Sequence, residues 1–297
     1  MKRHLVYIAL TLSTIFWGIS FVMTKELFLT EPKITVTILV TLRLCLASLI
    51  MVPGLFLLRK WEHIQKGDLK WFLLLSLAEP FVYNLFETSG VQLVSGSLSS
   101  IIVATIPVFV PFAMAAFYHE GLHANHILGV VLSLAGIGVM LIGGNDGLDG
   151  SAAGILFLCG AVLTAIVYTL LLMKVVGRYQ PFTITTYQNL IGMIYYLPLM
   201  FCTTGTQVFE LSWSPMMLLL IGILGIFCST IAYMGYNIGV QNLGATRACI
   251  FNNAIPVFTM IVAICIGQEQ LSMPKVLGMV IVIAGVVIAQ RQKQPAK

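Results

Sequence analysis

Three polar side chains, Glu79, Tyr83 and Glu87, follow one another at four-residue spacing inside a long apolar stretch. This spacing places them on one face of a helix, with Asn84 beside that face. A carboxyl group inside a hydrocarbon layer is costly, and it usually marks a substrate pathway, a proton relay or an ionic partner. We therefore predict that Glu79 is a coupling or cation-recognising carboxylate. The alternative is a structural pair with Arg43.

The depth of these groups favours a different partner for Arg43. At 1.5 Å per helical residue, Arg43 lies about 13 Å from the outer end of its helix, Glu87 about 9 Å and Glu79 about 21 Å. We therefore predict a structural ion pair between Arg43 and Glu87, which leaves Glu79 available for function.

Other polar and aromatic side chains lie within apolar stretches and need hydrogen-bond partners, which are either a substrate or a neighbouring helix. Trp17 lies near the middle of its stretch, so with Tyr83 and Tyr168 it could form an aromatic wall that packs on apolar groups or holds an ammonium group. With Glu79 and Asn84, the predicted substrate-binding residues are Trp17, Tyr83, Tyr168, Tyr187, Gln188, Tyr233, Asn237 and Asn252.

The segment His119-Glu120-Gly121-Leu122-His123 has the HExxH pattern, which can place two zinc ligands and a general base on one helix, and His126 adds a third imidazole. It predicts an intramembrane metalloenzyme as one alternative function. The internal repeat described below argues against that function, because the matching residues 268–272 keep the glutamate and lose both histidines. We therefore predict neither a metal site nor a cofactor.

The elements that position these residues follow from composition. The 297 residues are 59% hydrophobic and 9% charged, far from the roughly one-quarter charged residues of soluble domains. Long apolar runs recur, each close to the about 20 residues that a helix needs to cross a bilayer. The predicted fold is therefore all-α, with transmembrane helices at about 5–28, 34–58, 69–93, 97–118, 126–144, 151–173, 182–204, 214–240, 244–266 and 275–290.

The distribution of basic residues predicts the orientation. With the N-terminus inside, twelve of the 16 Lys and Arg residues fall on the cytoplasmic side. Positive charge gathers on the cytoplasmic side of membrane proteins, so both termini are predicted to be cytoplasmic, which requires an even number of helices. We expect a multi-pass protein of the plasma (inner) membrane, with the lipid bilayer as its surroundings.

The chain also matches itself without gaps at an offset of 149 residues. Five helices per half is an odd number, so the second half must be inverted relative to the first. We place the halves at residues 1–146 and 147–297, joined near 143–150. The matching residues include Lys25 with Lys174, Pro32 with Pro181, Gly90-Val91-Gln92 with Gly239-Val240-Gln241, and Ile106-Pro107-Val108-Phe109 with Ile255-Pro256-Val257-Phe258.

These features together resemble the EamA-type transporters of the drug/metabolite transporter superfamily. The resemblance is carried by Phe16-Trp17-Gly18, by Arg43 with Ala47, and by duplicated residues of the later helices, namely Pro107 and Pro256, Glu120 and Glu269, Gly129 and Gly136, and Gly278 and Gly285. It implies a ten-helix carrier of small metabolites, often an exporter, that does not hydrolyse ATP. It does not imply one substrate.

Pro107 and Pro256 are predicted to kink or loosen their helices near mid-membrane, as gating hinges or as static kinks. The paired glycines predict close helix packing, which serves the fold or a homodimer. The preferred function is a secondary carrier of amino acids or related compounds that works by alternating access, either with a coupled proton or by facilitated exchange. A non-transporting membrane scaffold is the other alternative, and we expect no nucleic-acid partner.

Overall fold

The computed structural model describes residues 3–59, 62–119, 124–143, 151–268, 270 and 272–289, and every regular element among them is helical. The predicted junction between the halves, at 144–150, lies outside these residues. Before that junction the elements are α1 (Arg3–Thr30), α2 (Val36–Leu57), α3 (Leu69–Ser76), the π-helix η1 (Leu77–Val82), α4 (Tyr83–Leu93), α5 (Gly96–Val103), α6 (Ile106–Tyr118) and α7 (Ala124–Gly143).

The second half repeats this order with two additional 3-10 helices. Its elements are α8 (Ala152–Val175), α9 (Pro181–Thr204), the 3-10 helix η3 (Gln207–Glu210), α10 (Pro215–Gly222), the π-helix η4 (Ile223–Ala232), α11 (Tyr233–Leu243), α12 (Ala245–Cys249), the 3-10 helix η5 (Ile250–Ala254), α13 (Ile255–Cys265) and α14 (Met273–Ala289).

Local sequence explains where several helices begin and end. The side chains of Thr35, Ser95 and Ser214 cap α2, α5 and α10 by accepting a backbone N–H from the first turn. Two helices end where the chain takes a positive φ that favours glycine, at Gly205 after α9 (φ 55°) and at Gly244 after α11 (φ 84°). These caps hold polar groups of the helix ends that would otherwise lack partners.

Seven helical segments of the described chain are long and apolar enough to cross a membrane, against the ten predicted from the sequence. The segments at the other three positions differ in composition. The first half of α9 carries Thr183, Thr185, Thr186, Gln188 and Asn189, which lower its hydropathy, and α7 and α14 contain shorter apolar stretches, Ile127–Gly136 and Met273–Gly285.

Two interruptions occur at matching places in both halves. In the third predicted span the helix breaks at Glu79 within η1. In the eighth the α-helix widens into the π-helix η4, which overlaps η1 at the 149-residue offset. In the fourth and ninth spans the α-helix stops before α6 and α13, so Pro107 and Pro256 lie in the first turn of a new helix. The predicted loosening at these prolines is therefore observed as a break just before each one.

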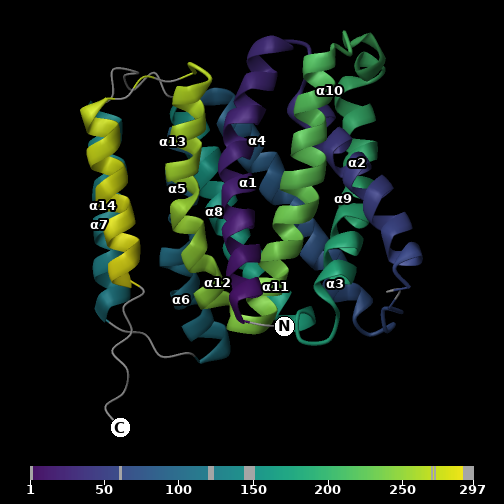
Figure 1. Ribbon diagram of the computed structural model, residues 1–297, viewed down its shortest axis with the longest axis horizontal. Coiled ribbons are helices and arrows are strands. Elements are labelled where there is room, and N and C mark those ends of the chain that lie inside the picture. The colour runs from purple at the N-terminus through teal and green to yellow at the C-terminus, as the bar shows by residue number, and fades with distance from the viewer. Residues whose placement is uncertain are drawn as a thin grey trace.

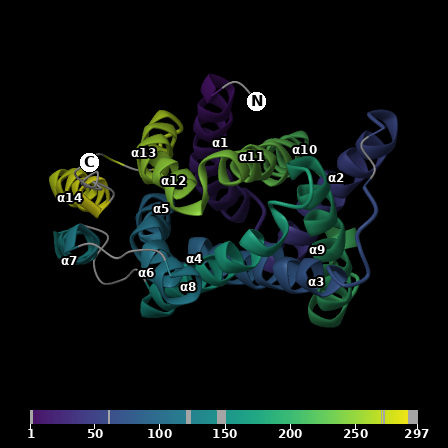
Figure 2. The same cartoon turned by 90° about the horizontal axis from the view of Figure 1, so that it is seen from below.

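The helices form two layers with a pair of helices at each end (Figures 1 and 2). The α1 layer contains α1 and α10 to α13, and the α8 layer contains α8 and α3 to α6, so each layer combines elements of both halves. Helices α2 and α9 pack on one another at one end, and α7 and α14 do so at the other. The start of α1 and the end of α14 lie on the same side of the bundle, here called the N-terminal face (Figure 1).

The pairing of α7 with α14 depends on a glycine that the sequence indicated as a packing residue. A Cβ atom added at Gly136 would lie 2.7 Å from the backbone oxygen of Gly278 and 2.7 Å from Cγ2 of Val282. The absence of a side chain therefore lets the two backbones approach closely, as small residues do between membrane helices.

Candidate functional site

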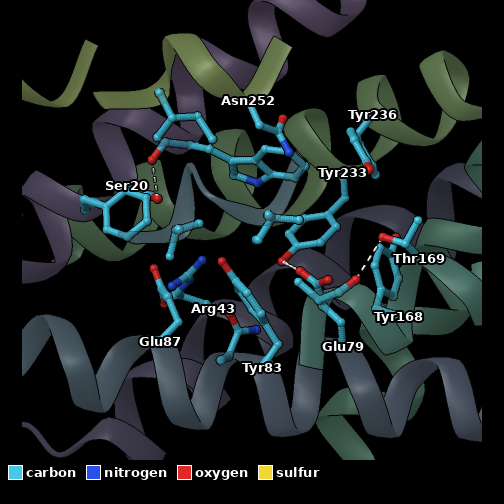
Figure 3. A pocket seen from close by; sticks show the side chains of 17 residues that line it. Ser20, Arg43, Glu79, Tyr83, Glu87, Tyr168, Thr169, Tyr233, Tyr236 and Asn252 are labelled. Atoms are coloured by element: carbon cyan, nitrogen blue, oxygen red, sulfur yellow. Dashed lines mark hydrogen bonds between the residues drawn. The ribbon is translucent and has the colours of Figure 1, made fainter. Parts of the chain in front are cut away.

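A pocket lies between the α1 layer and the α8 layer (Figure 3). Its cavity volume is about 50 Å³, which holds a few water molecules but not a metabolite. The pocket is lined by Trp17, Ser20, Phe21, Arg43, Glu79, Tyr83, Asn84, Glu87, Val103, Ile106, Ala165, Tyr168, Thr169, Tyr233, Tyr236, Asn252 and Ile255.

Glu79 sits at the break of the third span. It has non-helical backbone angles (φ −146°, ψ 123°) within η1, because the ring of Pro80 disfavours the helical conformation in the preceding residue. The break exposes the carbonyl of Glu79, which accepts a hydrogen bond from Gln188 Nε2 at 3.2 Å, while its carboxyl group accepts one from the hydroxyl of Tyr233. Two side chains of the second half thus hold Glu79 at the centre of the bundle, Gln188 through the carbonyl and Tyr233 through the carboxyl group.

Aromatic rings surround this carboxyl group. Trp17 contacts Tyr233 and Tyr236, with ring centroids 5.2 Å and 5.3 Å apart. Tyr83 and Tyr168 line the pocket from the α8 layer, as Figure 3 shows. Faces and edges of such rings can enclose an apolar side chain or attract an ammonium group.

A second group of polar side chains lies behind the pocket wall. Tyr168 donates to Asn237 Oδ1 at 3.3 Å, and Asn237 Nδ2 donates to Thr185 Oγ1 at 2.9 Å and to Gln188 Oε1 at 3.4 Å. Because Gln188 also holds the Glu79 carbonyl, this network fixes the wall around the acid, and of its members only Tyr168 lines the cavity.

Arg43 and Glu87 do not form the direct ion pair that the sequence predicted. Both are buried and line the pocket, but within the described chain the only side-chain ion pair within 4 Å joins Arg178 and Asp68. Arg43 Nε instead donates to Ser229 Oγ at 3.3 Å, and Glu87 accepts from the Thr88 hydroxyl at 3.1 Å. Helix depth predicted that the two residues lie at a similar level, but it carries no information about the hydroxyl groups of Ser229 and Thr88 that bind them instead.

Most residues singled out in the sequence meet at this pocket. Trp17, Glu79, Tyr83, Asn84, Tyr168, Tyr233 and Asn252 line it, whereas Gln188 and Asn237 belong to the network behind it. Tyr187 lies elsewhere and packs on Phe72, with ring centroids 5.7 Å apart. Neither Pro107 nor Pro256 lines the pocket, but each follows an isoleucine that does.

The internal repeat carries a signal that identifies two lining residues missing from the predicted site. Many lining residues occur in pairs separated by 149 positions, and shifting the predicted Glu87 and Asn252 by that offset gives Tyr236 and Val103. The pairs in the pocket are Ser20 with Thr169, Asn84 with Tyr233, Glu87 with Tyr236, Val103 with Asn252, and Ile106 with Ile255. The pocket therefore lies where the two repeats meet, although most pairs differ in chemistry.

His119, the described residue of the HExxH-like segment, does not line this pocket. His119 follows the end of α6 in a left-handed conformation, and residues 120–123, like Glu269, lie outside the described chain. Among the residues that are described, no group of three or more His, Cys, Asp or Glu side chains is placed to hold a metal ion.

Comparison with known proteins gives the family. The pattern of the EamA-like transporter family matches twice, at residues 4–142 and 152–290. The chain belongs to the EamA-like transporter family. The resemblance drawn from the sequence is thereby confirmed, and the protein is a multi-pass membrane transporter with two EamA repeats.

Relatives of this EamA-like transporter match along nearly their whole length. An uncharacterized transporter of Archaeoglobus fulgidus is 24% identical over 97% of this chain and 99% of its own. The uncharacterized transporter YetK of Bacillus subtilis is 23% identical over 99% of this chain and 89% of its own. A protein of known crystal structure shares the fold, with a TM-score of 0.68 at 17% identity over 94% of this chain and 98% of that one.

Proposed function

We propose that this EamA-like transporter is a secondary carrier that exports small amphipathic metabolites, amino acids and related compounds first, by alternating access. The observation that carries the proposal is the pocket itself. It lies at the meeting of two repeats, between layers that each combine both halves, and it is lined by Glu79 at the helix break in η1. Substrate sites of secondary transporters lie at such repeat interfaces, at discontinuous helices.

The chemistry of the pocket supports an amine-bearing substrate. Two carboxyl groups, Glu79 and Glu87, face one guanidinium group, Arg43, so the pocket can accept one further positive charge. That charge is either an ammonium group or a proton on Glu79. The rings of Trp17 and Tyr236 would contact the apolar part of the substrate and strengthen ammonium binding.

The proposed membrane arrangement completes this picture. We propose ten spans in two inverted five-helix repeats. Both termini would be cytoplasmic, and the protein would lie in the plasma (inner) membrane. The apolar outer surface of α14, which includes Leu277 and Val280, would face lipid or a second copy of the chain. The positive-inside bias supports the orientation.

The test is uptake of labelled amino acids, amines and nucleosides into proteoliposomes, with and without a pH gradient. We expect saturable uptake of an amine-bearing class that responds to the gradient, and we expect Glu79→Gln to abolish the response. Glu210→Gln, which removes an exposed carboxyl group outside the pocket, serves as the matched control.

Each outcome decides a separate part of the proposal. Uptake that neither the gradient nor Glu79→Gln changes would keep the carrier but refute the coupling role of Glu79. Failure to transport any member of the panel would count against the carrier and favour the scaffold.

A further inference from the structure

The duplicated tripeptide Gly-Val-Gln takes part in a contact between the two layers at each face of the bundle. On the face opposite the N-terminus, Lys25 of α1 donates from Nζ to the carbonyls of Val91 and Gln92 at the end of α4, at 3.2 Å and 3.1 Å. These carbonyls belong to the first copy of the tripeptide. The contact joins the α1 layer to the α8 layer.

On the N-terminal face the second copy of the tripeptide makes the corresponding contact. Gln241 of α11 donates from Nε2 to the carbonyls of Val176 and Tyr179, just after α8, at 2.9 Å and 3.2 Å. This contact also joins the α1 layer to the α8 layer. At both faces of the bundle a hydrogen-bonded link thus joins the two layers, near the end of a helix that lines the pocket.

The lysine and glutamine of these links occur in both repeats, but the donor is the lysine on one face and the glutamine on the other. At the 149-residue offset, Gln92 matches Gln241 and Lys25 matches Lys174. On the far face the lysine donates while the side chain of Gln92 is exposed. On the N-terminal face the glutamine donates, while Lys174 Nζ lies over the rings of Tyr118 and Trp71, 5.1 Å and 5.9 Å from their centroids. Side chains at equivalent positions of the two repeats therefore make different contacts.

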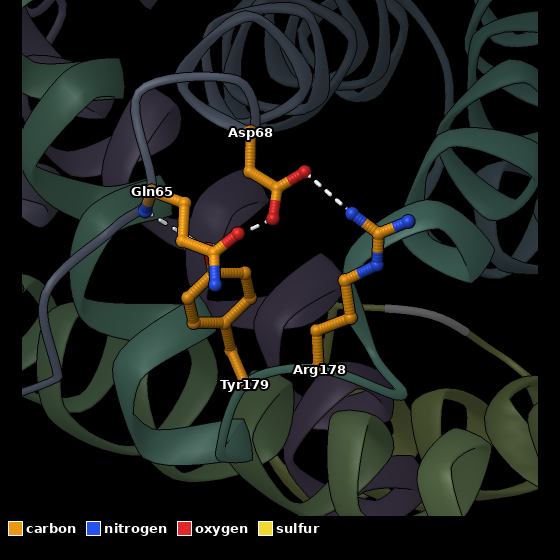
Figure 4. Close-up of polar contacts among 4 residues, drawn as sticks. All are labelled: Gln65, Asp68, Arg178 and Tyr179. Atoms are coloured by element: carbon orange, nitrogen blue, oxygen red, sulfur yellow. Dashed lines mark hydrogen bonds and ion pairs between the residues drawn. The ribbon is translucent and has the colours of Figure 1, made fainter.

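The receiving segment on the N-terminal face is itself anchored (Figure 4). Asp68, just before α3, accepts from Arg178 Nη1 at 2.6 Å and from the hydroxyl of Tyr179 at 2.9 Å, and the same hydroxyl accepts the backbone N–H of Gln65 at 3.1 Å. The side chain of Tyr179 is therefore fixed to the α2–α3 connection while its carbonyl receives Gln241.

Arg178 and Tyr179 contribute unequally to holding this segment on Asp68. The side chain of Arg178 is 62% exposed and that of Asp68 is 7% exposed, so solvent screens the ion pair strongly. The hydrogen bond from Tyr179 is buried, and its loss would leave a carboxylate oxygen without that donor. Tyr179 is therefore the more important anchor of the segment.

We propose that Lys25 and Gln241 are the two latches of the transporter, Lys25 closing the path to the pocket from the far face and Gln241 closing it from the N-terminal face. Access from one face requires that the latch on that face release its two carbonyls while the other stays closed. The inference rests on the alternating access proposed above, and it adds the contacts that must break.

The test measures access to the pocket without any substrate. In a chain whose six native cysteines are replaced, Ser20→Cys places one thiol on the pocket wall, where Ser20 is buried and its hydroxyl donates to the Trp17 carbonyl of its own helix. A membrane-impermeant thiol reagent is then applied to one face at a time in sealed proteoliposomes of known orientation.

We expect Gln241→Leu to raise the modification rate about tenfold from the N-terminal face alone, because an open form that was rare becomes populated. Lys25→Met should raise it by a similar factor from the far face alone. The matched controls are Gln92→Leu and Lys174→Met, the equivalent residues whose side chains make no such link, and they should leave both rates unchanged.

Several results would overturn the proposal. It fails if neither latch variant changes the rate, if one variant raises the rate from both faces, as general unfolding would, or if a control variant has the same effect as its partner. Because no substrate is involved, the latches can fail while uptake stands, and they can hold while the substrate panel gives no uptake.

Discussion

Gly192 of α9 lies against the ring of Pro80, the residue that forces Glu79 out of the helical conformation. A Cβ atom at position 192 would lie 2.3 Å from Cγ and 3.1 Å from Cδ of Pro80. Carbon atoms in good contact are about 3.5–4.0 Å apart, so the shorter distance falls below this range by more than 1 Å. The proline ring is bonded to its own backbone and cannot rotate away, so Gly192→Ala must displace the break that carries Glu79.

The structure sets the size of the effect. Overpacking of this kind costs about 1–3 kcal/mol, and the better helix propensity of alanine returns at most about 1 kcal/mol. Gly222→Ala is the matched control, because Gly222 is also helical and has no atom within 4 Å of the added Cβ. Relative to that control, we expect a melting temperature lower by about 2–8 °C.

We expect the uptake rate to be reduced by a much larger factor than the small drop in melting temperature would suggest. A misplacement of about 1 Å can reduce the rate of a positioned reaction by about 100-fold, and we expect a loss of that order in the uptake rate per folded molecule. The assays are thermal unfolding of the purified protein in detergent and uptake by proteoliposomes. Equal melting temperatures and equal uptake for the two variants would refute the idea that contact with Gly192 fixes the position of Glu79.

Two further predictions concern tyrosine hydroxyl groups. Tyr233→Phe removes the donor to the Glu79 carboxyl group, a loss of about 1–3 kcal/mol that should lower uptake about tenfold or more, whereas Tyr196→Phe, which removes a donor to the Phe81 carbonyl, should lower stability only. Equal uptake by the two variants would contradict this. Burial raises the pKa of Tyr179 above its ordinary value. A raised folded pKa adds stability that is lost as the pH rises, so the wild type should lose stability above about pH 10 and Tyr179→Phe should lack that component in thermal melts. Identical pH profiles would show that Tyr179 makes no such contribution.

The sequence predicted the helices and much of the site because both depend on local patterns. Apolar runs predicted the seven segments that are long and apolar enough to cross a membrane, and the four-residue spacing of Glu79, Tyr83 and Glu87 placed all three at the pocket. The Glu79-Pro80 dipeptide also contained the signal for the break in η1, since the residue before a proline avoids the helical conformation. Helix loosening was predicted only at Pro107 and Pro256.

What the sequence could not give depends on contacts between distant segments. Tyr187 lies one residue from Gln188, yet it points to Phe72 rather than to the network around Glu79. Arg43 donates a hydrogen bond to Ser229, which is 186 positions away in the sequence, instead of pairing with Glu87. Such choices depend on how helices rotate and cross, and periodicity within one helix does not fix either quantity.

The unlike latches of the two faces have a kinetic consequence. A lysine held by two carbonyls and a glutamine held by two carbonyls need not be equally strong, so the form open to one face can be more populated than the form open to the other. The half-saturation concentration measured from each face is raised in inverse proportion to the population of the form that binds there. Detailed balance nevertheless requires the ratio of maximal rate to half-saturation concentration to be the same in both directions when no ion is coupled. Unequal latches can therefore make the two sides differ in apparent affinity, but only a gradient of solute or of protons can make the flow net outward.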